Sequence, residues 1–221
     1  MSAQSMIEQL LKSGLSSLGG GSGGSSGGKD IGKYATGAAV GGALGLLLGS
    51  RGGRRIGGKA LKYGSVAALG ALAFRVYNEY QARQAEGAAP AAKPASSFEL
   101  LSPPQVETHS RAMLKAMIAA AKSDGHLDDR ERGLVEAELQ RVEADPVMRQ
   151  WVEAELRRPV EPADIAAAAQ SPEMGAEIYL ASVLVVDDTT TMERAYLDEL
   201  ARQLKLPAGL KAELEARVTA A

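Results

Sequence analysis

The chain has 221 residues, of which 45% are hydrophobic and 24% charged, and a formal net charge of -2 at pH 7. It contains no cysteine, which excludes disulfides, thiolate metal sites and cysteine nucleophiles. Residues 1–94 carry 11 Lys and Arg against 4 Asp and Glu, whereas residues 95–221 carry 14 against 23. The basic N-terminal part is suited to bind an anionic lipid surface, whereas the acidic C-terminal part is a poor partner for nucleic acid.

Residues 1–29 are expected to form a short helix and a flexible tether. Residues 6–11 can form a short amphipathic helix, and residues 19–28 contain only Gly and Ser, which is typical of a flexible coil. The N-terminus lacks the basic start and long apolar region of a cleavable signal peptide. Any insertion signal is therefore expected to be internal.

Residues 30–83 are predicted to be a glycine-rich membrane segment. Residues 34–50 carry no charge, residues 51–62 carry five basic residues and no acid, and residues 63–74 are again apolar. Glycines recur every fourth residue, and on a helix this spacing forms a smooth stripe that lets a second helix approach closely in lipid. The glycines expected to pack membrane helices are Gly37, Gly41, Gly45, Gly49 and Gly64.

Both apolar runs are shorter than the roughly 20 residues that a spanning helix needs, which leaves three arrangements open. A helical hairpin would place the basic turn in the cytoplasm and both chain ends outside. A single span through the first run would leave the C-terminal domain in the cytoplasm. In the third arrangement, both runs lie in the interface and span nothing. A soluble glycine-rich linker is the alternative without a membrane, and the small residues of the second run favour the hairpin.

The sequence predicts a linker at residues 84–97, which are rich in Ala and Pro, and an all-α domain at residues 98–221. Each predicted helix starts at a capping pattern followed by apolar residues at helical spacing, and no segment resembles a strand. About seven helices are expected. The clearest capping residues are Ser102 with Gln105, Asp145 before Pro146, Ser171 before Pro172, and Thr190 with Glu193.

The densest polar cluster, residues 124–131, is similar to the second half of an EF-hand calcium loop. Ala120 and Lys122 stand where such a loop needs its first carboxylates, so a standard calcium loop is excluded. The alternative to metal binding is that Asp128 and Glu131 form a helix capping box and that Gly125 ends the preceding helix.

Two parts of the sequence resemble known families. Residues 119–125 (AAAKSDG) resemble the motif of the tellurite-resistance TerB domain, an all-helical module, and residues 187–188 with 193–201 resemble its second acidic turn and following helix. Residues 41–55 and 62–64 are similar to the bacterial inner-membrane YebE-type family, domain of unknown function 533. The resemblance extends over most of residues 30–206.

This resemblance implies an inner-membrane protein with a TerB-like domain and no established activity. TerB-like domains have been proposed to bind metal through their acidic turns. Carried onto this sequence, with the neighbouring histidine added, the candidate metal ligands are Asp124, His126, Asp128, Glu131, Asp187, Asp188 and Glu193.

We therefore expect a non-enzymatic helical domain, anchored in the bacterial inner membrane, that binds a protein partner or senses a divalent cation in envelope stress. Its expected contacts are membrane lipid and a partner protein, or a second copy through the glycine stripe. No nucleic acid is expected, and no cofactor apart from that cation. Two alternatives stay open, namely a metal-dependent enzyme using the acidic turns and a glycine-zipper oligomer that acts on the membrane. The side of the membrane that holds residues 98–221 is left open.

Overall fold

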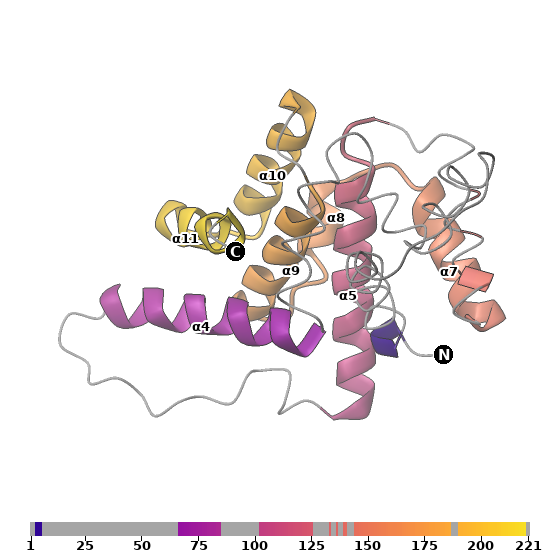
Figure 1. Cartoon of the computed structure of the whole chain (residues 1–221), viewed down its shortest axis with the longest axis horizontal. Helices are drawn as coiled ribbons and strands as arrows, with labels where there is room; N and C mark the ends of the chain where they lie inside the picture. The colour runs from indigo at the N-terminus through magenta and orange to yellow at the C-terminus, as the bar shows by residue number, and fades with distance from the viewer. Residues whose placement is uncertain are drawn as a thin grey trace, which may run out of the picture.

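The computed structural model describes residues 3–5, 66–84, 102–125, 144–186 and 190–219, and the single positions 133, 136, 139 and 140. In these ranges the chain is helical and has no strand, which confirms the all-α class there. The helices are α4 (Val66–Gln84), α5 (Pro103–Ala121), α7 (Pro146–Arg157), α8 (Pro162–Ala166), α9 (Pro172–Val185), α10 (Thr191–Gln203) and α11 (Ala208–Thr219) (Figure 1). The first apolar run and the glycines at positions 37, 41, 45, 49 and 64 lie outside the described residues.

The predicted caps define where the helices start. Asp145 Oδ1 accepts a 2.9 Å hydrogen bond from a backbone N–H in the first turn of α7. Thr190 and Glu193 form the predicted capping box of α10, with side-chain to backbone bonds of 3.1 and 3.0 Å. Ser102 and Ser171 stand at the equivalent positions of α5 and α9. Ser171 accepts from the Met174 N–H, and at α5 the Gln105 side chain accepts from the Ser102 N–H. These starts follow from local chemistry, because a nearby side chain satisfies an N–H group that the helix itself leaves without a partner.

Helix α9 lies at the centre of the described fold and contacts α4, α5, α10 and α11 (Figure 1). Nearly all of its side chains are buried. A helix that is apolar on all sides is stable only when other helices enclose it. The largest fully buried side chains of this core are Leu69, Met113, Leu114, Met148, Ile178, Tyr179, Leu180, Leu200, Leu210 and Leu214.

Helix α4 packs against α9 and α11 and belongs to this core. Its buried residues Leu69, Ala73 and Val76 recur at helical spacing, while Arg75 and Glu79 are exposed. The sequence left three arrangements open and favoured a membrane hairpin between this run and the first run, which lies outside the described residues. In the structure, α9 and α11 offer the described part of the run an apolar surface. Nowhere in the described ranges is a helix both long and apolar enough to cross a bilayer.

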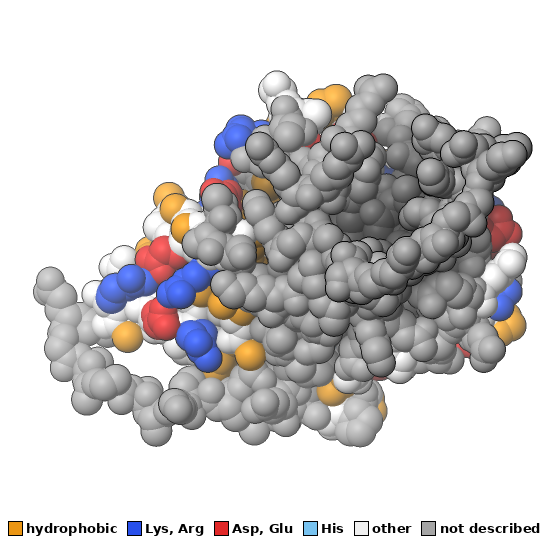
Figure 2. Space-filling model, in the orientation of Figure 1, with side chains coloured by type: hydrophobic (Ala, Val, Ile, Leu, Met, Phe, Trp, Pro, Cys, Tyr) orange, Lys and Arg blue, Asp and Glu red, His pale blue; other side chains and the backbone are white. Residues whose placement is uncertain are grey.

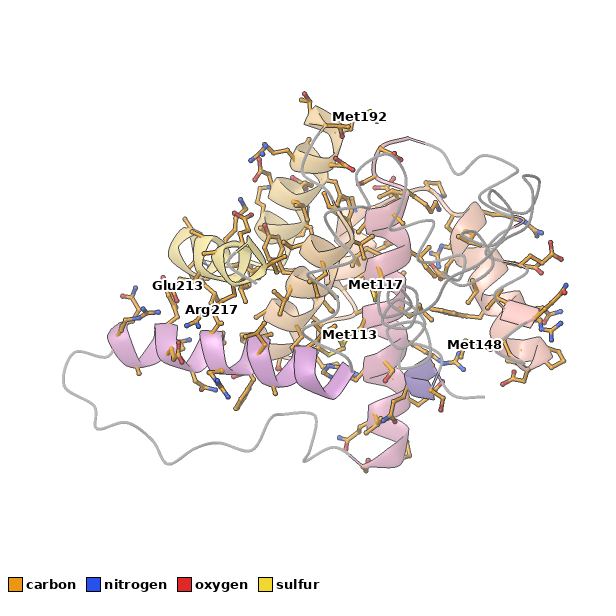
Figure 3. The ribbon with its side chains drawn as sticks, viewed as in Figure 1. Met113, Met117, Met148, Met192, Glu213 and Arg217 are labelled. Carbon is orange, nitrogen blue, oxygen red and sulfur yellow. The ribbon has the colours of Figure 1, made fainter. Side chains whose placement is uncertain are left out.

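The far half of α4 lies along α11. Arg83 pairs with Glu213, and Arg217 Nη2 lies 2.9 Å from Glu79 Oε2. Figure 3 shows Glu213 and Arg217 between the two helices, and Figure 2 shows basic and acidic side chains interspersed on this side of the molecule. Each exposed ion pair typically adds only about 0.2–1 kcal/mol to stability. These pairs therefore affect the orientation of α4 more than its stability.

Candidate functional site

The two acidic turns predicted from the sequence approach each other through Asp124 and Glu193. Asp124 follows α5, and Glu193 lies in the first turn of α10. Gly125 has a φ of +130°, a conformation that favours glycine, and a Cβ placed on it would lie 3.9 Å from Met192 Cε. The end of α5 therefore lies against the start of α10, and Glu193 is near enough to Asp124 to act on its charge.

This proximity changes the electrostatics of Asp124. Partial burial raises the pKa of its carboxyl group, the negative charge of Glu193 raises it further, and a backbone hydrogen bond opposes both effects. Two nearby carboxylates disfavour each other's ionised form, and a divalent cation bound between them would remove that repulsion. Carboxylate oxygens are also the donors that Mg²⁺ and Ca²⁺ prefer.

The rest of the predicted ligand set is not placed. His126, Asp128, Glu131, Asp187 and Asp188 lie outside the described residues. Among the residues that are described, no three His, Asp or Glu side chains come together as a metal site. Glu193 Oε2 also accepts a hydrogen bond from the Thr190 N–H, so part of the second turn serves as a helix cap. Asp124 and Glu193 are the two predicted ligands that the structure describes, and the metal site stays a prediction.

A buried histidine–carboxylate contact that the sequence did not predict joins α5 to α9. His109 Nε2 and Glu177 Oε2 form a short contact, and their side chains are 7% and 0% exposed. Gly70 of α4 closes the pair from a third side, since a Cβ placed there would lie 3.4 Å from Glu177 Oε2. The pair therefore lies where α4, α5 and α9 meet.

The role of such a buried pair is structural more than chemical. Removing two ionisable groups from water is costly, and the cost is offset only if they stay together. The pair therefore favours one arrangement of the three helices. The sequence did contain a signal, because Glu177 stands between Ala176 and Ile178 in an apolar helix, and a carboxylate there needs a partner. The sequence did not show that this partner is His109, because the two residues lie 68 positions apart in the chain.

A third group of polar contacts connects the first turn of the chain to α5 and α7. The Ala3 N–H donates a 2.9 Å hydrogen bond to Glu107 Oε2, and Arg111 Nε donates to Glu107 Oε1 at 2.8 Å. The Arg111 guanidinium lies 5.8 Å from the centroid of the Trp151 ring, within the range of a cation–π contact. Trp151 packs against the core.

In the described ranges, these features define an all-helical domain with an acidic turn at one end and a buried histidine–carboxylate pair inside. A family model described as "Protein of unknown function (DUF533)" matches residues 33–218. The chain belongs to this family, as its glycine-rich and acidic motifs suggested. The match includes α4, so the family covers the glycine-rich segment and the helical domain together.

One curated relative is 28% identical to the chain over 110 residues. It is the "Uncharacterized protein in ampR 5'region" of Yersinia enterocolitica, and the alignment covers 50% of this chain and 79% of the relative. No solved structure matches the chain.

Proposed function

We propose that this chain is a non-enzymatic helical domain of the bacterial inner membrane that senses a divalent cation at its acidic turns and transmits the bound state to a partner protein. The TerB-like character of residues 98–221 is part of the proposal. The observation that carries it is that the end of α5 lies against the start of α10, where Gly125 approaches Met192 and the charge of Glu193 acts on Asp124.

The cation supplies a positive charge at a place where the protein gathers negative charge. Asp124 and Glu193 would hold it through carboxylate oxygens, and acidic residues of the same two turns could complete its ligands. Glu193 also caps α10, so binding at its carboxylate acts directly on the first turn of that helix. A change at the start of α10 is therefore the signal that a partner would detect.

The anchoring part of the proposal rests on residues 34–62. An uncharged run followed by five basic residues suits an acyl layer next to anionic headgroups. The acidic helical domain would remain in water beside the membrane, because its charge disfavours contact with the same headgroups.

Thermal unfolding of the full chain in detergent tests the cation site. We expect Ca²⁺, Mg²⁺ or Mn²⁺ to raise the midpoint after treatment with a chelator, since a ligand that binds only the folded state stabilises it. Asp124→Asn should reduce the rise, and Glu173→Gln on α9 is the matched control that should retain it. Equal rises in both variants, or no rise in the unmodified chain, would rule out the site.

A further inference from the structure

Lys122 belongs to the acidic turn through its backbone and contacts α7 through its side chain. It caps the C-terminus of α5, and its carbonyl oxygen accepts a 3.1 Å hydrogen bond from the Gly125 N–H, which closes the turn that contains Asp124. Its Nζ donates to the carbonyl oxygen of Glu155, at 3.0 Å, and to that of Arg158. A shift of the turn therefore moves a residue that is bonded to α7.

The carbonyl groups that Lys122 binds lie at the C-terminal end of α7. The last carbonyls of a helix have no partner within it, and the peptide dipoles give that end a partial negative charge, which an ammonium group offsets. The helical partner of the Glu155 carbonyl would be residue 159, but Pro159 has no N–H to donate. The Lys122 side chain supplies a donor in its place.

The acidic turn is thus held from two sides. Helices α7 and α10 lie on either side of α5 (Figure 1). Gly125 approaches Met192 at the start of α10, and Lys122 binds the end of α7. Any change in the turn therefore acts on both helices.

Residues 158–164 connect α7 to α8 and are called the α7–α8 corner below. None of these residues is buried. The corner meets α5 through polar contacts, since Lys115 Nζ, on the same face of α5 as Lys122, donates to the Asp164 carbonyl oxygen at 3.3 Å. A cavity of about 10 Å³, large enough for about one water molecule, lies between the corner and α5. Because no buried side chain fixes the corner, it can shift without opening the core.

We propose that Lys122 is a positioning residue that couples the acidic turn to the α7–α8 corner, so that the corner changes its arrangement when a divalent cation binds the turn. This inference rests on the cation site proposed above and adds a second route for its signal, beside the first turn of α10. Mg²⁺ and Ca²⁺ hold their oxygen ligands at about 2.0–2.6 Å. Capture of the ion would therefore turn Asp124 and move the backbone between Lys122 and Gly125. Helix α8 follows the corner and packs against α10, so both routes meet there.

A fluorescent probe on the corner measures this coupling. The chain has no cysteine, so Ala163→Cys, at an exposed position, takes a single environment-sensitive maleimide dye. The labelled full chain in detergent would be treated with a chelator and titrated with Ca²⁺ or Mg²⁺, and its thermal midpoint would be measured in parallel. Lys122→Met removes the ammonium group, and Lys122→Arg keeps a charged donor. Lys115→Met is the matched control, because Lys115 binds the same corner from the same face of α5 without belonging to the acidic turn.

We expect the cation to change the fluorescence of the labelled chain. Lys122→Met should lose this change and still show a rise in the thermal midpoint, because Asp124 and Glu193 are intact. Lys122→Arg and Lys115→Met should retain both responses.

Three results would overturn the inference: a fluorescence response that survives in Lys122→Met, a response that is lost in Lys115→Met, or a midpoint that rises in the labelled chain with no change in fluorescence. The last result needs no substitution at Lys122, so the test does not depend on the folding of Lys122→Met. A midpoint that rises in none of the chains would instead overturn the cation site, and this inference with it.

Discussion

Gly70 of α4 lies directly over the carboxylate of Glu177 on α9. A Cβ at position 70 would be 3.4 Å from Oε2 and 3.5 Å from Cδ of that side chain. The carboxylate is bound to His109 on α5, so it cannot move aside without breaking a buried pair. This contact sets how closely α4 approaches the core.

A larger side chain at this position should push α4 off α9. Gly70→Leu is expected to lower the free energy of unfolding by about 1–3 kcal/mol, the usual cost of overpacking. Urea unfolding followed by circular dichroism measures the change. Gly133→Leu is the matched control, because a Cβ there meets nothing within 4 Å, and it should leave stability unchanged or raise it by up to about 1 kcal/mol. Equal losses in the two variants would show that Gly70 is not a contact point.

Breaking the buried pair from one side should be more costly than removing both partners. Glu177→Leu or His109→Leu alone is expected to cost about 3–5 kcal/mol, because each breaks the buried contact while the other ionisable group stays in the core. The double variant should recover part of that loss. A double-mutant cycle in urea measures the coupling, with Glu173→Leu in the first turn of α9 as the control. Additive losses would mean that the two side chains do not act as a pair.

Local chemistry made much of the fold predictable. Asp145, Ser171 and Thr190 start helices as expected because a cap depends only on residues three or four positions away.

The positions of α4 and of Glu177 were not predictable on those grounds. An apolar run of small residues suits a lipid-packed helix and a protein-packed helix equally well, and only the surface offered by α9 and α11 decides between them. The His109–Glu177 pair and the proximity of Asp124 to Glu193 depend on contacts between distant parts of the sequence. Periodicity and capping patterns contain no information about such contacts.

The cap of α10 offers a test that is independent of any ligand. Thr190→Ala should lower the free energy of unfolding by about 1 kcal/mol, since the N–H of Glu193 would lose its bond to the threonine hydroxyl. Thr191→Ala, one residue later and exposed, should change it by less than about 0.5 kcal/mol. Chemical unfolding under cation-free conditions compares the two variants. A larger loss for Thr191→Ala would place the cap elsewhere.

The raised pKa of Asp124 predicts a pH-dependent effect of its neutralisation. A carboxyl group whose pKa is higher in the folded than in the unfolded protein destabilises the fold when it is ionised, and this penalty disappears as the pH falls through the raised value. In chelator, Asp124→Asn should therefore raise the melting temperature at neutral pH. The advantage should shrink on acidification toward the ordinary value of 3.8. Two results would contradict this: an Asp124→Asn variant that melts below the unmodified chain at neutral pH, or one whose gain in melting temperature is the same at neutral and at acidic pH.

The central claim is that residues 31–62 anchor a helical domain that includes α4. Membrane fractionation of the full chain against a chain lacking residues 31–62 tests it most directly, because the deletion leaves α4 and its contacts in place. We expect the full chain to stay with membranes through a high-salt wash, and the shortened chain to appear in the soluble fraction with the melting temperature of its helical domain unchanged. A folded, shortened chain that still sediments with membranes after the wash would contradict the account.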